Sequence, residues 1–324
     1  MKKYRNILLV LDAAGYNHNA LEKAFFMAKL DPEVKVTVFL AIFDFSYELS
    51  TIMSFTEKEE MLSKIIDAKE AEVEQVIREQ GLENKNLTVK VVWARSAGGA
   101  MGRELKQGSY DLIIKACAEN GVIGSFLQTP IDWKLLRKAK IPVILVKEKT
   151  WEPDGAILVA LCFTELGFCN RVNRKLLREA QILSKLTGCK IHLVNAVHVP
   201  VINTYIDVPG YLPSTYNEAV MNDHTAKIKR YADDHRIPLE NIHVRSGSPE
   251  EVIPQVAEEL DATAVILGCV GRDGFSGTVI GNTAEMIMDE MSCDLIVIKT
   301  PEELFDTSPD EDAPQTGDET ANDE

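Results

Sequence analysis

Ile7-Leu-Leu-Val-Leu-Asp12 is matched by Ile157-Leu-Val-Ala-Leu-Cys162, and these two apolar runs decide the fold. Each is followed by a helix-period segment and then by further apolar runs in the same order, five runs to each half. The halves close on matching runs at 142–147 and 294–299. The chain is therefore a tandem duplication.

The runs are continuous in Val, Ile and Leu, which is typical of parallel strands covered on both faces. Alternating strands and helices then give right-handed crossovers. The sequence predicts an α/β protein of two tandem doubly wound parallel-sheet domains, 1–150 and 151–301, with a disordered acidic tail at 302–324. Because a free fifth strand is an exposed edge, we expect the domains to pair through these strands as a pseudo-dimer.

Helix-start signals support the duplication. Thr56 and Glu59 form a predicted capping box for a long helix that ends at Gly81. Thr129-Pro130 and Asn282-Thr283 are matching starts for the last helix of each domain.

Composition excludes several functions. Ten acids and no Lys or Arg lie in 302–324, and no basic stripe offsets the net charge of −15, so we expect no nucleic-acid partner. No targeting segment or membrane span is expected, and the six cysteines include no Cys-x-x-Cys pair. The six histidines lack metal-ligand spacing. We expect a cytoplasmic protein with reduced cysteines and no resident metal.

One loop of the second domain has the character of a phosphate cradle. Its glycines follow the fourth strand and let the backbone approach a ligand, and the helix that begins next offers free amides to an anion. The candidate binding residues are Gly268, Gly271, Arg272, Gly281, Asn282 and Thr283. A plain turn is the alternative.

The first domain lacks these glycines. In the sequence alignment, Lys115, Ala118 and Gln128 stand where the second domain has Gly268, Gly271 and Gly281. Asp12 ends the first strand, where an acid accepts a hydrogen bond from a ribose or base, or else caps the loop that follows. Cys162 takes its place in the second domain, so each domain keeps one half of a site.

The segments after the second strands, 44–55 and 203–213, are rich in aromatic and other large apolar residues. Two interpretations are open for these segments. They pack between the domains, or they form the wall of a pocket for an apolar or amphipathic ligand.

The spacing of Gly268, Gly271 and Gly281 resembles the ATP-binding signature of the universal stress protein family, with Asn282 in place of the usual Ser or Thr. The segments 43–48, 129–137 and 281–285 resemble those of tandem members. The resemblance covers 4–147 and 156–299 and implies strand order 3-2-1-4-5 in each domain. It also implies a backbone contact to the ligand at Ala196 or Val197.

The resemblance implies a cytoplasmic binding protein that supports survival under starvation, oxidative stress and DNA damage. Its expected partners are a small ligand, with ATP and the accompanying Mg²⁺ in the second domain, and other universal stress proteins. One alternative is a scaffold whose grooves hold an apolar or amphipathic metabolite. The other is slow ATP hydrolysis or autophosphorylation, which the missing Walker lysine and catalytic acid disfavour.

Overall fold

The computed structural model describes residues 4–13, 18–45, 54–82, 85–116, 135–136, 139–163, 168–198, 213–269, 286–288 and 290–299. Five of the predicted binding residues lie outside these ranges, namely Gly271, Arg272, Gly281, Asn282 and Thr283. The predicted helix starts at Thr129 and Asn282 and the tail 302–324 also lie outside them.

The first module alternates strands and helices. Its elements are β1 (Asn6–Leu11), α1 (His18–Leu30), β2 (Lys35–Ile42), α3 (Phe55–Glu79), β3 (Leu87–Trp93), α4 (Ala97–Gln107), β4 (Leu112–Ala116) and β5 (Val143–Val146). The second module repeats this order. Its elements are β6 (Ala156–Ala160), α6 (Phe168–Thr187), β7 (Lys190–Val197), α7 (Pro213–Asp234), the 3₁₀ helix η1 (Leu239–Asn241), β8 (Ile242–Ser246), α8 (Pro249–Glu259), β9 (Ala264–Cys269) and β10 (Asp294–Lys299).

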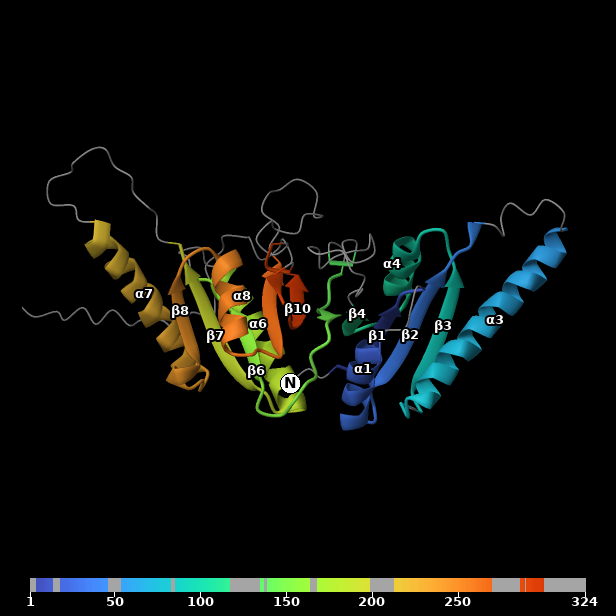
Figure 1. Cartoon of the computed structure of the whole chain (residues 1–324), viewed down its shortest axis with the longest axis horizontal. Coiled ribbons are helices and arrows are strands. Elements are labelled where there is room, and N and C mark those ends of the chain that lie inside the picture. Colours follow the sequence, from blue (N-terminus) through green and yellow to red (C-terminus); the bar gives the residue numbers. More distant parts are fainter. Residues whose placement is uncertain are drawn as a thin grey trace, which may run out of the picture.

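All ten strands form one sheet in the order β3-β2-β1-β4-β5-β10-β9-β6-β7-β8. Neighbours within each module are parallel, and β5 and β10 meet antiparallel at the centre. The predicted strand order and the predicted pairing of the fifth strands are both confirmed. Figure 1 shows the two modules side by side, with α3 and α7 at the outer ends.

Helices cover both faces of the sheet, as the continuous apolar strands predicted. Alternate residues of β1 show the division, since Ile7 and Leu9 pack in one core and Leu8 and Val10 in the other. The first core takes side chains from α1, α3, α6 and α7, and the second takes them from α4 and α8. Both faces of a central strand such as β5 are therefore buried and apolar.

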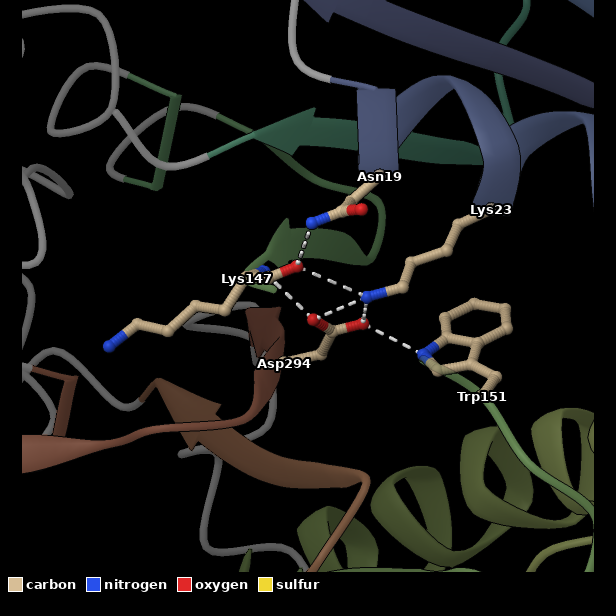
Figure 2. A network of polar contacts seen from close by, with 5 residues as sticks. All are labelled: Asn19, Lys23, Lys147, Trp151 and Asp294. Atoms are coloured by element: carbon tan, nitrogen blue, oxygen red, sulfur yellow. Dashed lines mark hydrogen bonds and ion pairs between the residues drawn. The ribbon is translucent and has the colours of Figure 1, made fainter. Parts of the chain in front are cut away.

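A buried polar cluster reinforces the junction of the modules (Figure 2). Nζ of Lys23 on α1 lies 2.7 Å from Oδ2 of Asp294, the first residue of β10. The same carboxylate accepts the backbone N–H of Lys147 at 2.8 Å and the indole N–H of Trp151 at 2.7 Å. The ring of Phe26 packs edge-on against that of Trp151. Helix packing and charge pairing therefore join the modules in addition to the β5–β10 ladder.

The predicted capping box of the long helix is wrong by two residues. α3 begins at Phe55, and its capping box joins Ser54 to Glu57. Ser54 and Glu57 have the same spacing as Thr56 and Glu59, so the pattern fits either pair. The other end is confirmed, because Gly81 follows the helix with φ of +65°.

Candidate functional site

The candidate sites lie at the carboxyl edge of the sheet, where strand order reverses beside the first strand of each module. In the first module this point lies between β1 and β4, and in the second between β6 and β9. Asp12 follows β1, and Cys162 lies just beyond the end of β6. The structure therefore places the two predicted positions at equivalent points.

An internal ion pair occupies this point in the first module. Nζ of Lys115 on β4 donates to Oδ2 of Asp12 at 2.8 Å and to the carbonyl oxygen of Ala116 at 3.0 Å. The Lys115 side chain is fully buried, and that of Asp12 is 23% exposed. The acid that was expected to accept a hydrogen bond from a ribose or base thus already has a charged partner inside the protein.

Ladder register corrects the sequence alignment of Lys115 with Gly268. Ile7 of β1 pairs with Leu112, and its counterpart Ile157 pairs with Ala264. Counting along β4 and β9 from these pairs, Gly268 corresponds to Ala116, and Lys115 corresponds to Leu267. The alignment failed by one residue because a short continuous apolar run has no marker of register.

Gly268 has a packing role in the described structure. A Cβ built on it would lie 3.1 Å from Cγ1 of Val172 and 3.7 Å from the methyl groups of Leu176, both on α6. Close approach of α6 to β9 therefore explains this glycine without a ligand. Ala116, its counterpart, has a Cβ and is buried in the core of the first module.

The backbone contact implied at Ala196 or Val197 falls at the end of β7. Val197 is 1% exposed, and its carbonyl oxygen accepts the backbone N–H of Gly247 at 3.1 Å. The carbonyl of Ile42 in the first module accepts that of Ala94 at 2.9 Å in the same way. The modules are thus alike at this position, and they differ at the ends of their first and fourth strands.

Uncharged groups occupy the equivalent point of the second module. Asn173 of α6, which is fully buried, donates to the carbonyl of Cys162 at 2.8 Å and accepts its N–H at 3.2 Å. Asn195 donates to the carbonyl of Leu161 at 3.0 Å, and its own oxygen lies 2.7 Å from Nδ1 of His224. The amide oxygen can only accept, so Nδ1 of His224 carries the hydrogen.

Two thiols lie within this uncharged region. Sγ of Cys162 is 2.7 Å from Sγ of Cys169, in the first turn of α6. The hydrogen bond to Cys169, together with burial, raises the pKa of the Cys162 thiol above its ordinary value. Burial, with a smaller contribution from Lys227, lowers the pKa of His224. Cys162 and His224 are therefore neutral near pH 7.

Sequence reasoning missed Lys115, Asn173 and Cys169 as partners. A lysine at the end of the run Leu112-Ile-Ile was the available signal, because a buried lysine needs an acid nearby. The other two residues lie on a helix, and the sequence offered no sign that this helix returns to Cys162.

A groove of about 1070 Å³ lies elsewhere, at the opposite edge of the second module where β6, β7 and β8 begin. Two ion pairs lie along it, one between Lys190 and Asp154 at 3.4 Å and one between Lys149 and Asp261. Within the described ranges, no three side chains of His, Cys, Asp or Glu gather as metal ligands do. No helix among the described residues combines the length and apolar character that crossing a membrane requires.

Residues 3–147 and 170–299 match the Universal stress protein family. The chain belongs to this family. Universal stress protein E of Escherichia coli strain K12 is 36% identical over 317 residues, which cover 96% of this chain and 100% of that protein. The Universal stress protein E homolog of Haemophilus influenzae is 35% identical over 302 residues, which cover 92% of this chain and 98% of that protein. The resemblance seen in the sequence is thereby confirmed.

Solved structures agree on the universal stress protein fold. A putative universal stress protein from Pseudomonas aeruginosa UCBPP-PA14 superposes with a TM-score of 0.69 at 22% identity, covering 93% of this chain and 95% of that one. A universal stress protein from Archaeoglobus fulgidus superposes with a TM-score of 0.58 at 16% identity, covering 91% of this chain and 97% of that one. At these identities the likeness shows the fold alone.

Proposed function

We propose that this universal stress protein is a ligand-binding protein and not an enzyme, with its ligand site at the carboxyl edge of the second module. The ion pair between Lys115 and Asp12 carries the proposal. It fills the reversal point of the first module with charges that already satisfy each other. The second module has Leu267 and Cys162 at these two places, and neither side chain forms such an ion pair.

Two ligand classes fit the second module. An adenine nucleotide such as ATP, with its Mg²⁺, is favoured by the glycine spacing from Gly268 to Gly281 and the helix start at Asn282. An apolar or amphipathic metabolite is favoured by the lack of an acid at Cys162 and by Phe163, which is buried beside it. Binding is preferred to catalysis because the chain has no Walker lysine, and the acid after the first strand is absent or paired.

The physiological role that accompanies this site is support of survival under starvation, oxidative stress or DNA damage in the cytoplasm. Other universal stress proteins are the expected protein partners. A deletion strain tested for survival under each stress separately checks this part of the proposal.

Native mass spectrometry of the purified protein, followed by calorimetric titration with Mg-ATP, tests the ligand site. We expect Gly271→Val to weaken ATP binding ten- to a hundredfold, on the order of 1–3 kcal/mol, through steric strain. Asp12→Ala is the matched control and should bind like the wild type. A copurified amphipathic ligand, together with no ATP binding at millimolar concentration, would select the second ligand class. Loss of ATP binding in Asp12→Ala alone would show that the site lies in the first module and contradict the proposal.

A further inference from the structure

Cys162 and Cys169 form a close thiol pair at the carboxyl edge of the second module. Their sulfur atoms are 2.7 Å apart, and neither residue is in a disulfide. Cys162 is partly exposed, whereas Cys169 is 2% exposed. A reagent in solvent therefore reaches Cys162 first.

The pair is held by a single helix. The side chain of Asn173 forms hydrogen bonds with both the N–H and the carbonyl of Cys162, as described above. Asn173 lies four residues after Cys169 on α6. Residues four apart share one face of a helix. Because α6 supplies both the partner thiol and the side chain that fixes Cys162, the approach of the two sulfurs is built into the fold.

The separation of the sulfurs favours a disulfide over a metal site. An S–S bond is about 2.05 Å long, so the sulfurs need to approach by roughly 0.7 Å. Two thiolates on one tetrahedral zinc ion, each about 2.3 Å from the metal, would lie about 3.8 Å apart. In the part of the chain that the structure describes, no third metal-ligating side chain joins the pair.

We propose that Cys162 and Cys169 are an oxidation site, which a hydroperoxide such as hydrogen peroxide converts to an intramolecular disulfide. The Cys162 thiolate attacks one peroxide oxygen, the O–O bond breaks, and the departing hydroxide takes a proton to become water. This leaves a sulfenic acid at Cys162. The sulfur of Cys169 then attacks the sulfenic sulfur, the S–S bond forms, and the S–O bond breaks. Hydroxide leaves with the Cys169 proton as a second water, and two electrons have passed from the thiols to the peroxide.

The thiolate form of a cysteine attacks peroxide, and the thiol form does not. Its raised pKa keeps Cys162 in the thiol form near neutrality, so the first step is slow at pH 7 and accelerates as the pH rises. The site thus responds to sustained or strong exposure to oxidant. The disulfide would tie the end of β6 to the first turn of α6, next to the ligand site proposed above. The chemistry itself does not depend on that site being correctly assigned.

Peptide mass spectrometry of the full-length protein provides a direct test. Residues 150–171 form one tryptic peptide that contains both cysteines, because no Lys or Arg lies between Lys149 and Arg171. The protein is exposed to hydrogen peroxide at pH 7 and pH 8.5, denatured, alkylated with iodoacetamide and digested. We expect this peptide to lose two hydrogen atoms and to carry no alkyl group, faster at pH 8.5, and to regain two alkylation sites after dithiothreitol.

Cys189 and Cys293 are internal controls, since each is buried and lies alone in its own tryptic peptide. Both should stay alkylated at peroxide doses that close the pair. In Cys169→Ser, a sulfenic acid should accumulate at Cys162 and react with dimedone, whereas Cys189→Ser should behave as the wild type. Full alkylation of both residues in 150–171, oxidation that is no faster there than at Cys189, or pairing of Cys162 with another cysteine would overturn the proposal.

Discussion

Lys23 and Asp294 belong to different modules, yet their charged groups are 2.7 Å apart and the side chains are 6% and 0% exposed. The carboxylate accepts two further hydrogen bonds, from the N–H of Lys147 and the indole of Trp151 (Figure 2). Burial nevertheless raises the pKa of Asp294, with the Lys23 charge and these donors opposing the shift. The pair therefore affects stability chiefly through the buried, unpaired charge that remains when one member is removed.

Asp294→Ala should lower the free energy of unfolding by about 3–5 kcal/mol, because it leaves the ammonium of Lys23 buried without its partner. Urea denaturation measures the loss. Asp223→Ala is the matched control, since Asp223 and Lys227 form an exposed ion pair at 2.6 Å along one helix. That change should cost at most about 0.5 kcal/mol. Equal losses in the two variants would contradict a special role of the junction pair.

Asp12→Ala should lower the free energy of unfolding by about 3 kcal/mol, because Lys115 is fully buried and loses its counter-charge. The double variant Asp12→Cys/Lys115→Leu copies Cys162 and Leu267 of the second module, and we expect it to lose less than Asp12→Ala alone. Chemical denaturation of the wild type, the single variants Asp12→Cys and Lys115→Leu, and the double variant gives the coupling. If the losses in free energy of unfolding of the two single variants add up to that of the double variant, the two side chains do not stabilise each other.

Gly268→Ala should cost about 1 kcal/mol and Gly268→Val about 3 kcal/mol, because each added atom presses on Val172. Gly102→Ala is the control in helix α4, where an added Cβ meets nothing within 4 Å. That change should stabilise the protein by about 0.5–1 kcal/mol. Thermal unfolding compares the variants, and a neutral Gly268→Val would show that α6 does not set the need for glycine.

His192 and His243 stack with Nδ1 and Nε2 3.1 Å apart. Burial lowers the pKa of both rings, and the charges of His243 and Lys190 lower that of His192 further. The folded state therefore binds fewer protons than the unfolded state just below pH 6.5, so their contribution to stability is lost as the pH falls. NMR titration should give both pKa values below 6.5, and His243→Gln or Lys190→Gln should raise that of His192. An unchanged His192 pKa in both variants would contradict this account.

Most of the fold was predictable because repetition and apolar runs are long-range signals. The match of Ile7–Asp12 to Ile157–Cys162 predicted two equivalent modules, and the ladder between β5 and β10 confirmed their junction. The helix start at Ser54 was missed because two serine or threonine residues offered the same cap. Such errors of two residues are local, and they leave the topology unaffected.

The candidate site was less predictable because it depends on side chains from separate elements. Asp12 was recognised by its place after a strand, but its partner Lys115 comes from a strand about a hundred residues later. Gly268 was interpreted as a residue for ligand approach, which stays a prediction, and its packing against α6 was not foreseen. The aromatic segment 44–55 lies largely outside the described residues, and its ends, Phe45 and Phe55, are exposed at 61% and 76%. Packing between the modules therefore does not explain these two side chains.

In the antiparallel ladder Ile144 of β5 pairs with Ile296 of β10, and the pseudo-twofold axis passes through this pair. The axis makes Val143 equivalent to Leu295, and therefore Pro142 is the counterpart of Asp294. In a homodimer every substitution appears twice, and a residue that suits one side of the axis is imposed on the other. Here the axis lies within one polypeptide, and an acid can pair with Lys23 on one side while a proline occupies the other. Each half of the junction is thus free to change by itself, and so is the carboxyl edge of each module. The sequence has kept the symmetry of the backbone while its side chains have diverged.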